Sequence, residues 1–146
     1  MVRLIVAEPV AVYAKRSPLV VDSSFLATWV FGEPGCDEVE ARMDGWALCA
    51  PQVLDYEMAN IGMNKIRSGL AMIESATAAL SRYQSLDIAL SAVAPVEMLR
   101  IAERYRLTSY DASYLWLADS LAAPLATFDR TLGNAARAHF AHASGN

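Results

Sequence analysis

Several kinds of residue are scarce in this chain, and each scarcity excludes a class of protein. The 146 residues include only two cysteines, Cys36 and Cys49, which are too few to define a disulfide framework. We therefore expect reduced thiols in a cytoplasmic protein. No uninterrupted apolar run approaches the roughly 18 residues that a membrane span requires, which predicts a soluble protein. Glu8 and Pro9 interrupt the apolar start of the chain, so we expect no export signal.

Positive charge is also scarce. The chain has 12 basic and 16 acidic residues and a net charge of -4 at pH 7, which argues against binding of nucleic acid by overall charge. Arg100, Arg104 and Arg106 lie close together, but Glu97 and Glu103 are interspersed with them. We interpret this mixture as a solvated helix face, and a local contact with RNA remains the alternative.

The length and composition predict one substantial core. A chain of 146 residues fits a single domain, and an apolar fraction of 55% with a mean hydropathy of +0.25 indicates elements buried on more than one side, or an oligomer. We expect an N-terminal extension over residues 1–17 with a strand-like piece at 4–6, a domain over 18–140, and a tail over 141–146. The scarcity of surface charge favours a homodimer.

Hydrophobic periodicity and breakers predict strands that alternate with helices. The predicted strands are 19–21, 46–50, 87–90 and 124–128, and the predicted helices are 24–30, 36–43, 51–67, 72–83, 95–106, 108–121 and 132–138. This order is typical of an α/β protein, and we predict a three-layer α/β/α sandwich around a central parallel sheet. The sheet should have four to five strands. The fifth is in doubt, because the final segment, 140–146, is a poor strand.

Two acidic residues directly follow predicted strands. Asp22 comes after the short apolar run 19–21, and Asp129 comes after the strand that ends near Phe128. Ligands of parallel sheets bind just beyond the carboxyl ends of the strands, which is where both carboxylates should lie. The alternative for Asp22 is an N-cap of the following helix, and the alternative for Asp129 is an ordinary turn residue.

Two further acids interrupt apolar helix faces. Glu57 lies on the same stripe as Leu54 and Ile61, at spacings of three and four residues, and Asp111 begins the apolar stripe of a later helix. A buried carboxylate needs a cation or hydrogen bonds. The alternatives are a Glu57 side chain at the rim of its stripe with its head in water, and a capping box that pairs Asp111 with Thr108.

The four acids together predict a cation site. Four carboxylates cannot share a cleft stably without cations, and ligand sets made only of oxygen suit Mg²⁺ or Mn²⁺. Such an ion lowers the pKa of a bound water and orients it toward a phosphate. No cysteine or histidine is suitably placed as a nucleophile, which favours water as the attacking group. We interpret His139 and His142 as an incidental pair near the end of the chain.

The segments 21–24, 54–61, 108–114 and 125–130 resemble, in order and spacing, the PIN-domain nucleases, and among them the VapC-type toxins of toxin-antitoxin pairs. The resemblance spans about residues 18–138, and its most specific pieces are Tyr-Asp-Ala-Ser-Tyr and Thr-Phe-Asp-Arg. It implies a Mg²⁺-dependent endoribonuclease that cleaves RNA and is restrained by an antitoxin protein. The acidic site and its two supporting positions correspond to Asp22, Glu57, Asp111, Asp129, Ser23 and Thr127.

Two other functions remain open from the residues alone. A phosphoryl-transfer protein also places acids at strand ends, but Ser24 occupies the position where such families need a second Asp, and Lys15 and Lys65 are the only lysines. A noncatalytic binding module could fold the same acids around a structural cation. Loss of metal-dependent RNA cleavage in an Asp22→Asn variant would separate these possibilities.

Overall fold

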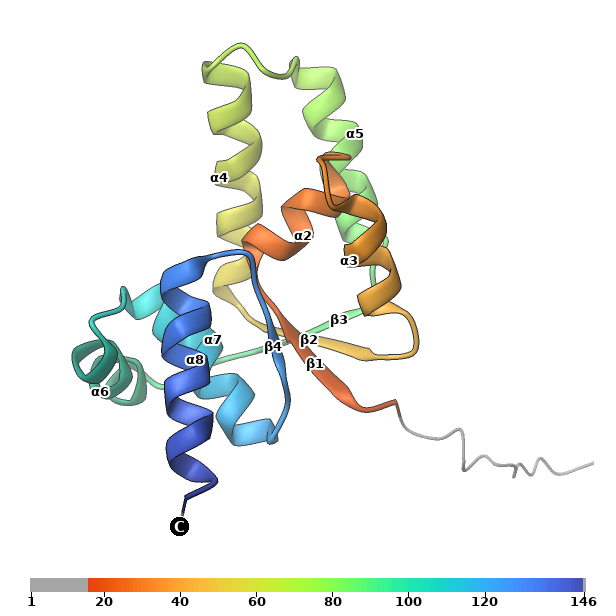
Figure 1. Ribbon diagram of the computed structural model, residues 1–146. Helices are drawn as coiled ribbons and strands as arrows, with labels where there is room; N and C mark the ends of the chain where they lie inside the picture. The colour runs from red at the N-terminus through yellow and green to blue at the C-terminus, as the bar shows by residue number, and fades with distance from the viewer. Residues whose placement is uncertain (1–15, 146) are drawn as a thin grey trace, which may run out of the picture.

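The computed structural model describes residues 16–145. Within this range, four parallel strands form one sheet in the order β3-β2-β1-β4 (Figure 1). The strands are β1 (Pro18–Val21), β2 (Ala47–Pro51), β3 (Ile88–Ser91) and β4 (Leu125–Ala126). The predicted α/β fold with a central parallel sheet is confirmed.

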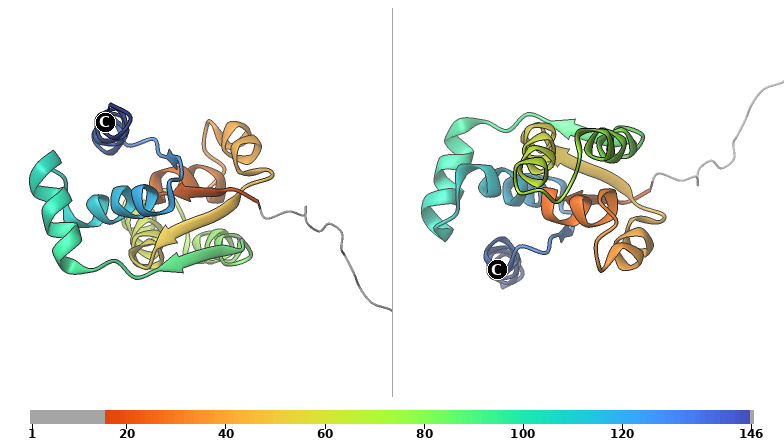
Figure 2. Two further views of the ribbon diagram at one scale, coloured as in Figure 1. Left: turned by 90° about the horizontal axis from the view of Figure 1, so that it is seen from below. Right: turned by 90° about the horizontal axis from the view of Figure 1, so that it is seen from above.

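Helices cover both faces of this sheet. On one face α7 packs across β1, β2 and β4, with α6 and α8 against α7, and on the other face α2 packs against α3, α4 and α5 (Figures 1 and 2). The predicted three-layer arrangement is therefore confirmed. The helices are α2 (Ser23–Val30), α3 (Cys36–Met43), α4 (Val53–Arg67), α5 (Ile73–Gln84), α6 (Pro95–Tyr105), α7 (Ser109–Leu121) and α8 (Arg130–Ala143).

Strand β1 is central because its apolar residues are buried on both faces. Val20 is fully buried and pairs with Cys49 of β2 on one side and Leu125 of β4 on the other. Its backbone N–H donates to the carbonyl of Pro124 at 3.0 Å. A strand buried on both faces needs consecutive apolar residues rather than alternating ones, which explains the run over 19–21.

The carboxyl edge of the sheet is where several helices begin. Asp22 is the N-cap of α2, Asp129 is the N-cap of α8, and α4 begins two residues after β2 ends. Parallel strands direct all of these junctions to one edge, so side chains far apart in sequence meet there. In Figure 1 this edge lies where the starts of α2 and α4 approach the start of α8.

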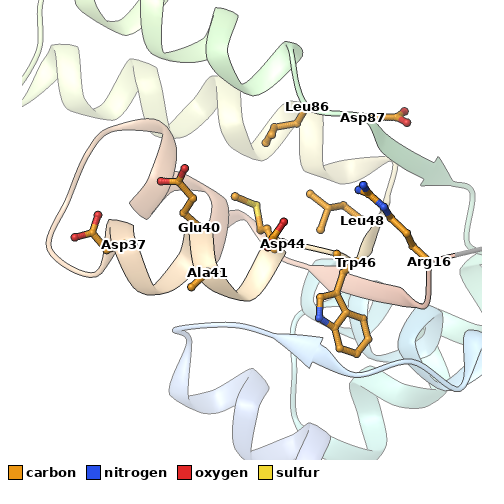
Figure 3. Close-up of a pocket in the computed structure, with 11 residues that line it drawn as sticks. Arg16, Asp37, Glu40, Ala41, Asp44, Trp46, Leu48, Leu86 and Asp87 are labelled. Carbon is orange, nitrogen blue, oxygen red and sulfur yellow. The ribbon is translucent and has the colours of Figure 1, made fainter. Parts of the chain in front are cut away.

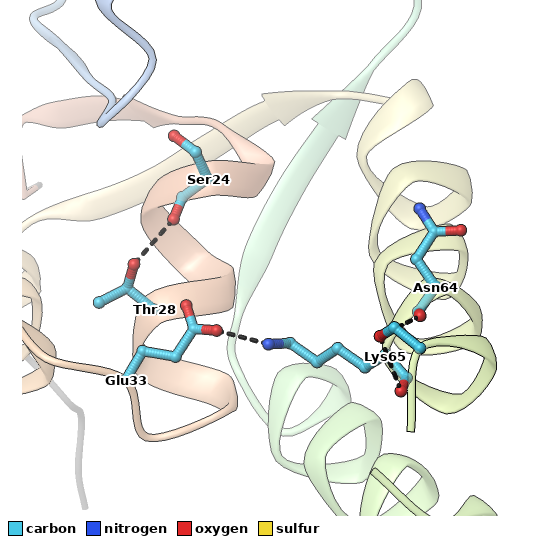
Figure 4. A network of polar contacts seen from close by, with 6 residues as sticks. Ser24, Thr28, Glu33, Asn64 and Lys65 are labelled. Carbon is cyan, nitrogen blue, oxygen red and sulfur yellow. Dashed lines mark hydrogen bonds and ion pairs between the residues drawn. The ribbon is translucent and has the colours of Figure 1, made fainter. Parts of the chain in front are cut away.

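One polar contact joins the C-terminal part of α4 to the turn after α2. Lys65 of α4 donates to Glu33, just after α2, at 2.5 Å (Figure 4). Its ammonium also lies 4.9 Å from the centroid of the Phe31 ring. Within α2, Thr28 Oγ1 donates to the carbonyl of Ser24 at 3.0 Å.

The opposite edge of the sheet carries a hollow of about 600 Å³ that the sequence did not predict (Figure 3). Arg16, Trp46 and Asp87 are among the residues that line it. None of the four predicted site acids lies on its walls. This hollow is therefore separate from the carboxyl edge, where the predicted chemistry belongs.

The C-terminal segment differs from the prediction. The last helix, predicted over 132–138, runs from Arg130 to Ala143, so the segment considered for a fifth strand is helical up to that residue. It is anchored by His139, whose ring contacts the Tyr105 hydroxyl at 2.7 Å and the Asp119 carboxylate at 2.9 Å. These tertiary contacts, which local sequence cannot reveal, account for the longer helix.

Other sequence predictions have definite outcomes. The strand-like piece at 4–6 lies outside the described residues, as does most of the predicted extension. In the range 16–145, no helix is both long and apolar enough to cross a membrane. Cys36 and Cys49 are both free thiols, as expected.

Candidate active site

Asp22 is the most firmly held of the four acids. Only 4% of its surface is exposed. Its Oδ1 accepts hydrogen bonds from the Phe25 backbone N–H at 2.9 Å and the Ser24 hydroxyl at 2.8 Å, while its Oδ2 accepts from the Thr127 hydroxyl at 2.5 Å. Burial raises the pKa of Asp22, and these three donors oppose the rise by stabilising the anion. The predicted N-cap and the site residue are thus the same side chain.

Two hydroxyl groups connect Asp22 to the segment after β4. The Thr127 hydroxyl, which donates to Asp22, also accepts from the Asp129 backbone N–H at 2.9 Å. The Ser24 hydroxyl, which donates to Asp22 from the other side, accepts from the Phe128 backbone N–H at 2.9 Å. The start of α2 and the start of α8 are therefore held together through one carboxylate.

Glu57 of α4 reaches the same edge from the neighbouring helix. Its Oε1 accepts a hydrogen bond of 2.6 Å from the hydroxyl of Tyr114, which is almost fully buried in α7. The Ser23 hydroxyl lies near enough to the Glu57 carboxylate to lower its pKa slightly. Burial raises the pKa of Glu57, the bond from Tyr114 lowers it, and the charge of Asp22 raises it again. Glu57 is only partly buried. Its position is therefore intermediate between the two interpretations of the sequence, a side chain on the core-facing stripe and one at the rim with its head in water.

Asp111 carries the clearest electrostatic signal. Burial raises its pKa to about 6, and the negative charges of Asp129, Glu57 and Asp22 contribute in that order. The capping alternative is half correct, because Thr108 caps α7 by accepting from the Asp111 backbone N–H at 3.1 Å. The Asp111 carboxylate itself accepts no hydrogen bond from the part of the chain that the structure describes.

Asp129 lies at the exposed side of the group. It caps α8 by accepting from the Leu132 backbone N–H at 2.9 Å, which accounts for the predicted turn role. Its charge also raises the pKa values of Asp22 and Asp111. Asp111 thus lies within electrostatic range of the other three predicted acids, and Asp22 lies within range of both Glu57 and Asp129.

The donor set fits a hard divalent cation in charge and chemistry. All four side chains offer oxygen, and none of them forms an ion pair with a Lys, Arg or His among the described residues. Their mutual repulsion is the electrostatic condition that a cation would relieve. Still, no three His, Cys, Asp or Glu side chains in the range 16–145 are placed to hold one ion together.

Sequence reasoning missed two residues of this site. Ser24 enters the sequence analysis only at the position of a missing second Asp, although its hydroxyl bonds both Asp22 and the backbone after β4. Tyr114 lies in the Tyr-Asp-Ala-Ser-Tyr segment without a predicted role, but its hydroxyl donates to Glu57. The available signal was a tyrosine three residues after Asp111, since a buried tyrosine hydroxyl normally needs a partner.

Comparison with known proteins places this geometry in a family. The PIN domain family model matches residues 19–138, so the chain belongs to the PIN domain family. The range includes every acid described above. No curated protein matches the chain.

Two solved structures are similar to the whole domain. One is PAE2754 from Pyrobaculum aerophilum, with 28% identity over 82% of this chain and 86% of that chain, and a TM-score of 0.63. The other is VapC20 of Mycobacterium tuberculosis, described as a sarcin-ricin loop cleaving toxin, with 14% identity, coverage of 80% and 94%, and a TM-score of 0.58. At 14% identity the second likeness shows the fold alone.

Repulsion at Asp111 should be measurable as stability. Its raised folded-state pKa stabilises the fold below an unfolded pKa of about 4, and this contribution is lost as the pH rises through about 6. Asp111→Asn should therefore melt higher than wild type at pH 7 in chelator, and the gain should shrink at pH 5. Because solvent screens part of the repulsion at this half-buried residue, we expect a rise of about 2–4 °C.

Thermal melts at both pH values would check this, with Asp87→Asn as a matched control. Asp87 is exposed at the opposite edge of the sheet, so the control should show no such gain. A purely capping role for Asp111 gives the opposite sign, because loss of a first-turn acid slightly destabilises a helix. A lower melting temperature for Asp111→Asn at pH 7 would contradict the repulsion.

Proposed function

We propose that this protein is a metal-dependent endoribonuclease that acts as the toxin of a toxin-antitoxin pair. The observation that carries the proposal is the meeting of Asp22, Glu57, Asp111 and Asp129 at the carboxyl edge of a PIN-domain sheet without a basic partner in the described chain. The proposed cofactor is Mg²⁺, with Mn²⁺ as an alternative, and the proposed substrate is RNA.

Each acid has a distinct place in the proposed mechanism. Asp22 and Asp111 would be the main ligands of the ion, with Glu57 and Asp129 completing the negative charge. When bound, the ion supplies a lowered pKa for an attacking water and neutralises charge on the phosphate. Asp22 is pre-oriented by its three donors, and Glu57 by Tyr114, so little reorganisation of these side chains is needed.

The toxin role is supported by sequence resemblance and by fold. The motifs around Asp22, Asp111 and Asp129 resemble those of VapC-type toxins, and the fold is similar to that of VapC20. We infer a cytoplasmic protein whose antitoxin inserts a segment near the acidic edge. A small DNA-binding protein encoded beside this reading frame would support the pairing.

The phosphoryl-transfer alternative is weakened by the residue two positions after Asp22. Ser24 stands where such families need a second Asp, and its hydroxyl donates to Asp22. Lys65 is paired with Glu33. The RNA cleavage assay described below distinguishes a noncatalytic binding module from the proposed nuclease.

Asp22→Asn should reduce RNA cleavage by about two orders of magnitude or more, because it removes a ligand charge worth several kcal/mol to the transition state. The fold should survive, since the amide oxygen still accepts from Phe25 and the Thr127 hydroxyl can turn to accept from the amide nitrogen. Cleavage of fluorescent RNA with Mg²⁺ and with chelator would measure the effect.

Asp87→Asn, which has the same chemical change at the opposite edge, should retain wild-type cleavage. Wild-type protein that binds Mg²⁺ but cuts no RNA would support the binding module instead. Cleavage that persists in chelator would exclude the metal-dependent mechanism.

We also propose that the protein forms a homodimer through α6. This helix buries none of its residues in the described monomer, and Val96 and Leu99, three residues apart, are 56% and 68% exposed. Side chains three apart lie on the same helix face, so they form an apolar stripe that a second copy can cover.

Leu99→Glu should convert the dimer to a monomer, because it would bury a charge in the interface. Light scattering at micromolar concentration would measure the mass. Leu70→Glu, at an equally exposed leucine in the turn between α4 and α5, should remain dimeric. A monomeric wild type would exclude the dimer, and a dimeric Leu99→Glu variant would exclude α6 as its interface.

A further inference from the structure

Phe128 is an exposed aromatic residue between two residues of the acidic site in the chain. Its neighbours in the chain are Thr127, which bonds Asp22, and Asp129, one of the four acids. About 50% of the Phe128 side chain is exposed to solvent. Single exposed apolar residues are common, but this one is adjacent in the chain to two residues of the acidic group.

The Phe128 ring packs against other residues of the protein on one side. It stacks on the ring of Phe25 in α2, with centroids 6.2 Å apart and an interplanar angle of 25°. A Cβ built on Gly35 would lie 3.8 Å from Phe128 Cζ, so the α2–α3 turn borders the ring. The Phe128 backbone N–H donates to Ser24 Oγ. The Phe25 ring and the α2–α3 turn thus border the Phe128 ring, and the Phe128 backbone is held by the same hydroxyl that donates to Asp22.

The residues around Phe128 favour a nucleotide as the ligand that stacks on this ring. Arg130 is exposed two residues further on and forms no ion pair with the described residues. An exposed aromatic ring with an exposed arginine two residues away in the chain is a combination with which proteins bind single-stranded nucleic acid, stacking the base and neutralising the phosphate. The bases of a duplex are already stacked on each other and cannot use such a face.

We propose that Phe128 is a stacking platform for an unpaired base of the RNA substrate, with Arg130 contacting a neighbouring phosphate. This inference rests on the proposed ribonuclease function and adds to it two residues that would position the RNA. Phe128 positions the nucleotide next to the acids and takes no part in the bond cleavage itself.

Binding of fluorescein-labelled RNA by the full chain tests the platform. The Asp22→Asn background prevents cleavage, Mg²⁺ is present, and the probes are short single-stranded RNAs of randomised sequence and a duplex of the same composition. Phe128→Ala should weaken single-strand binding about five- to hundred-fold, the range found for loss of one stacked base. Duplex binding should not change.

Three further variants separate stacking from packing. Phe128→Leu keeps an apolar contact with Phe25 but has no aromatic face, so it should bind as weakly as Phe128→Ala. Phe128→Trp should bind like the parent. Leu121→Ala is the matched control. Leu121 is 40% exposed at the C-terminal end of α7, at the opposite end of that helix from Asp111, and its replacement should not change RNA binding.

The outcomes separate this inference from the proposed function. Equal binding by Phe128→Leu and the parent would overturn the platform and assign the exposed ring to a protein contact. Equal loss of single-strand and duplex binding in Phe128→Ala would also overturn it. If the protein with Asp22 intact cuts RNA but is indifferent to Phe128, only the platform fails. If it neither binds nor cuts any RNA, the proposed function fails together with the platform.

Discussion

The hydrogen bond from the Thr127 hydroxyl to Asp22 is the contact on which the site depends. It joins the end of β4 to the end of β1, two segments 105 residues apart in sequence, at the edge where the helices begin. The Ser24 hydroxyl makes the second connection, between Asp22 and the backbone of Phe128. Without these bonds Asp22 would be a buried carboxylate with one backbone donor, which is a costly arrangement. Fold stability and site geometry therefore share the same few polar groups.

Electrostatic repulsion is the complementary constraint. Burial and then the charges of Asp129, Glu57 and Asp22 raise the pKa of Asp111 to about 6, and no basic side chain in the described chain pairs with these acids. Such an arrangement lowers stability at neutral pH and is typical of functional sites. A divalent cation would relieve the repulsion, which links the strain in the fold to the proposed nuclease activity. The rigid ring of Phe128 adds an apolar face beside this charge, suited to a base rather than to a phosphate.

The sequence predicted the sheet and the positions of the acids, but not the contacts between them. The apolar run before Asp22 indicated a buried strand, and helical spacing placed Glu57 and Asp111 on core-facing sides, because both signals are local. The bonds of Tyr114 to Glu57 and of Ser24 to Phe128 depend on how distant segments meet, and local patterns do not contain that information. For the same reason α8 was predicted too short, since the anchoring of His139 comes from other helices.

Proton release on Mg²⁺ binding tests the central claim, that the repelling carboxylates form a cation site. Calorimetric titration of the full chain at pH 6, in two buffers that differ in ionisation enthalpy, measures the protons released. Because Asp111 has a pKa of about 6, Mg²⁺ should displace a fraction of a proton at pH 6 and much less at pH 7.5. Asp111→Asn should remove this release and weaken binding. An absence of Mg²⁺ binding, or a proton release unchanged by Asp111→Asn, would contradict the account.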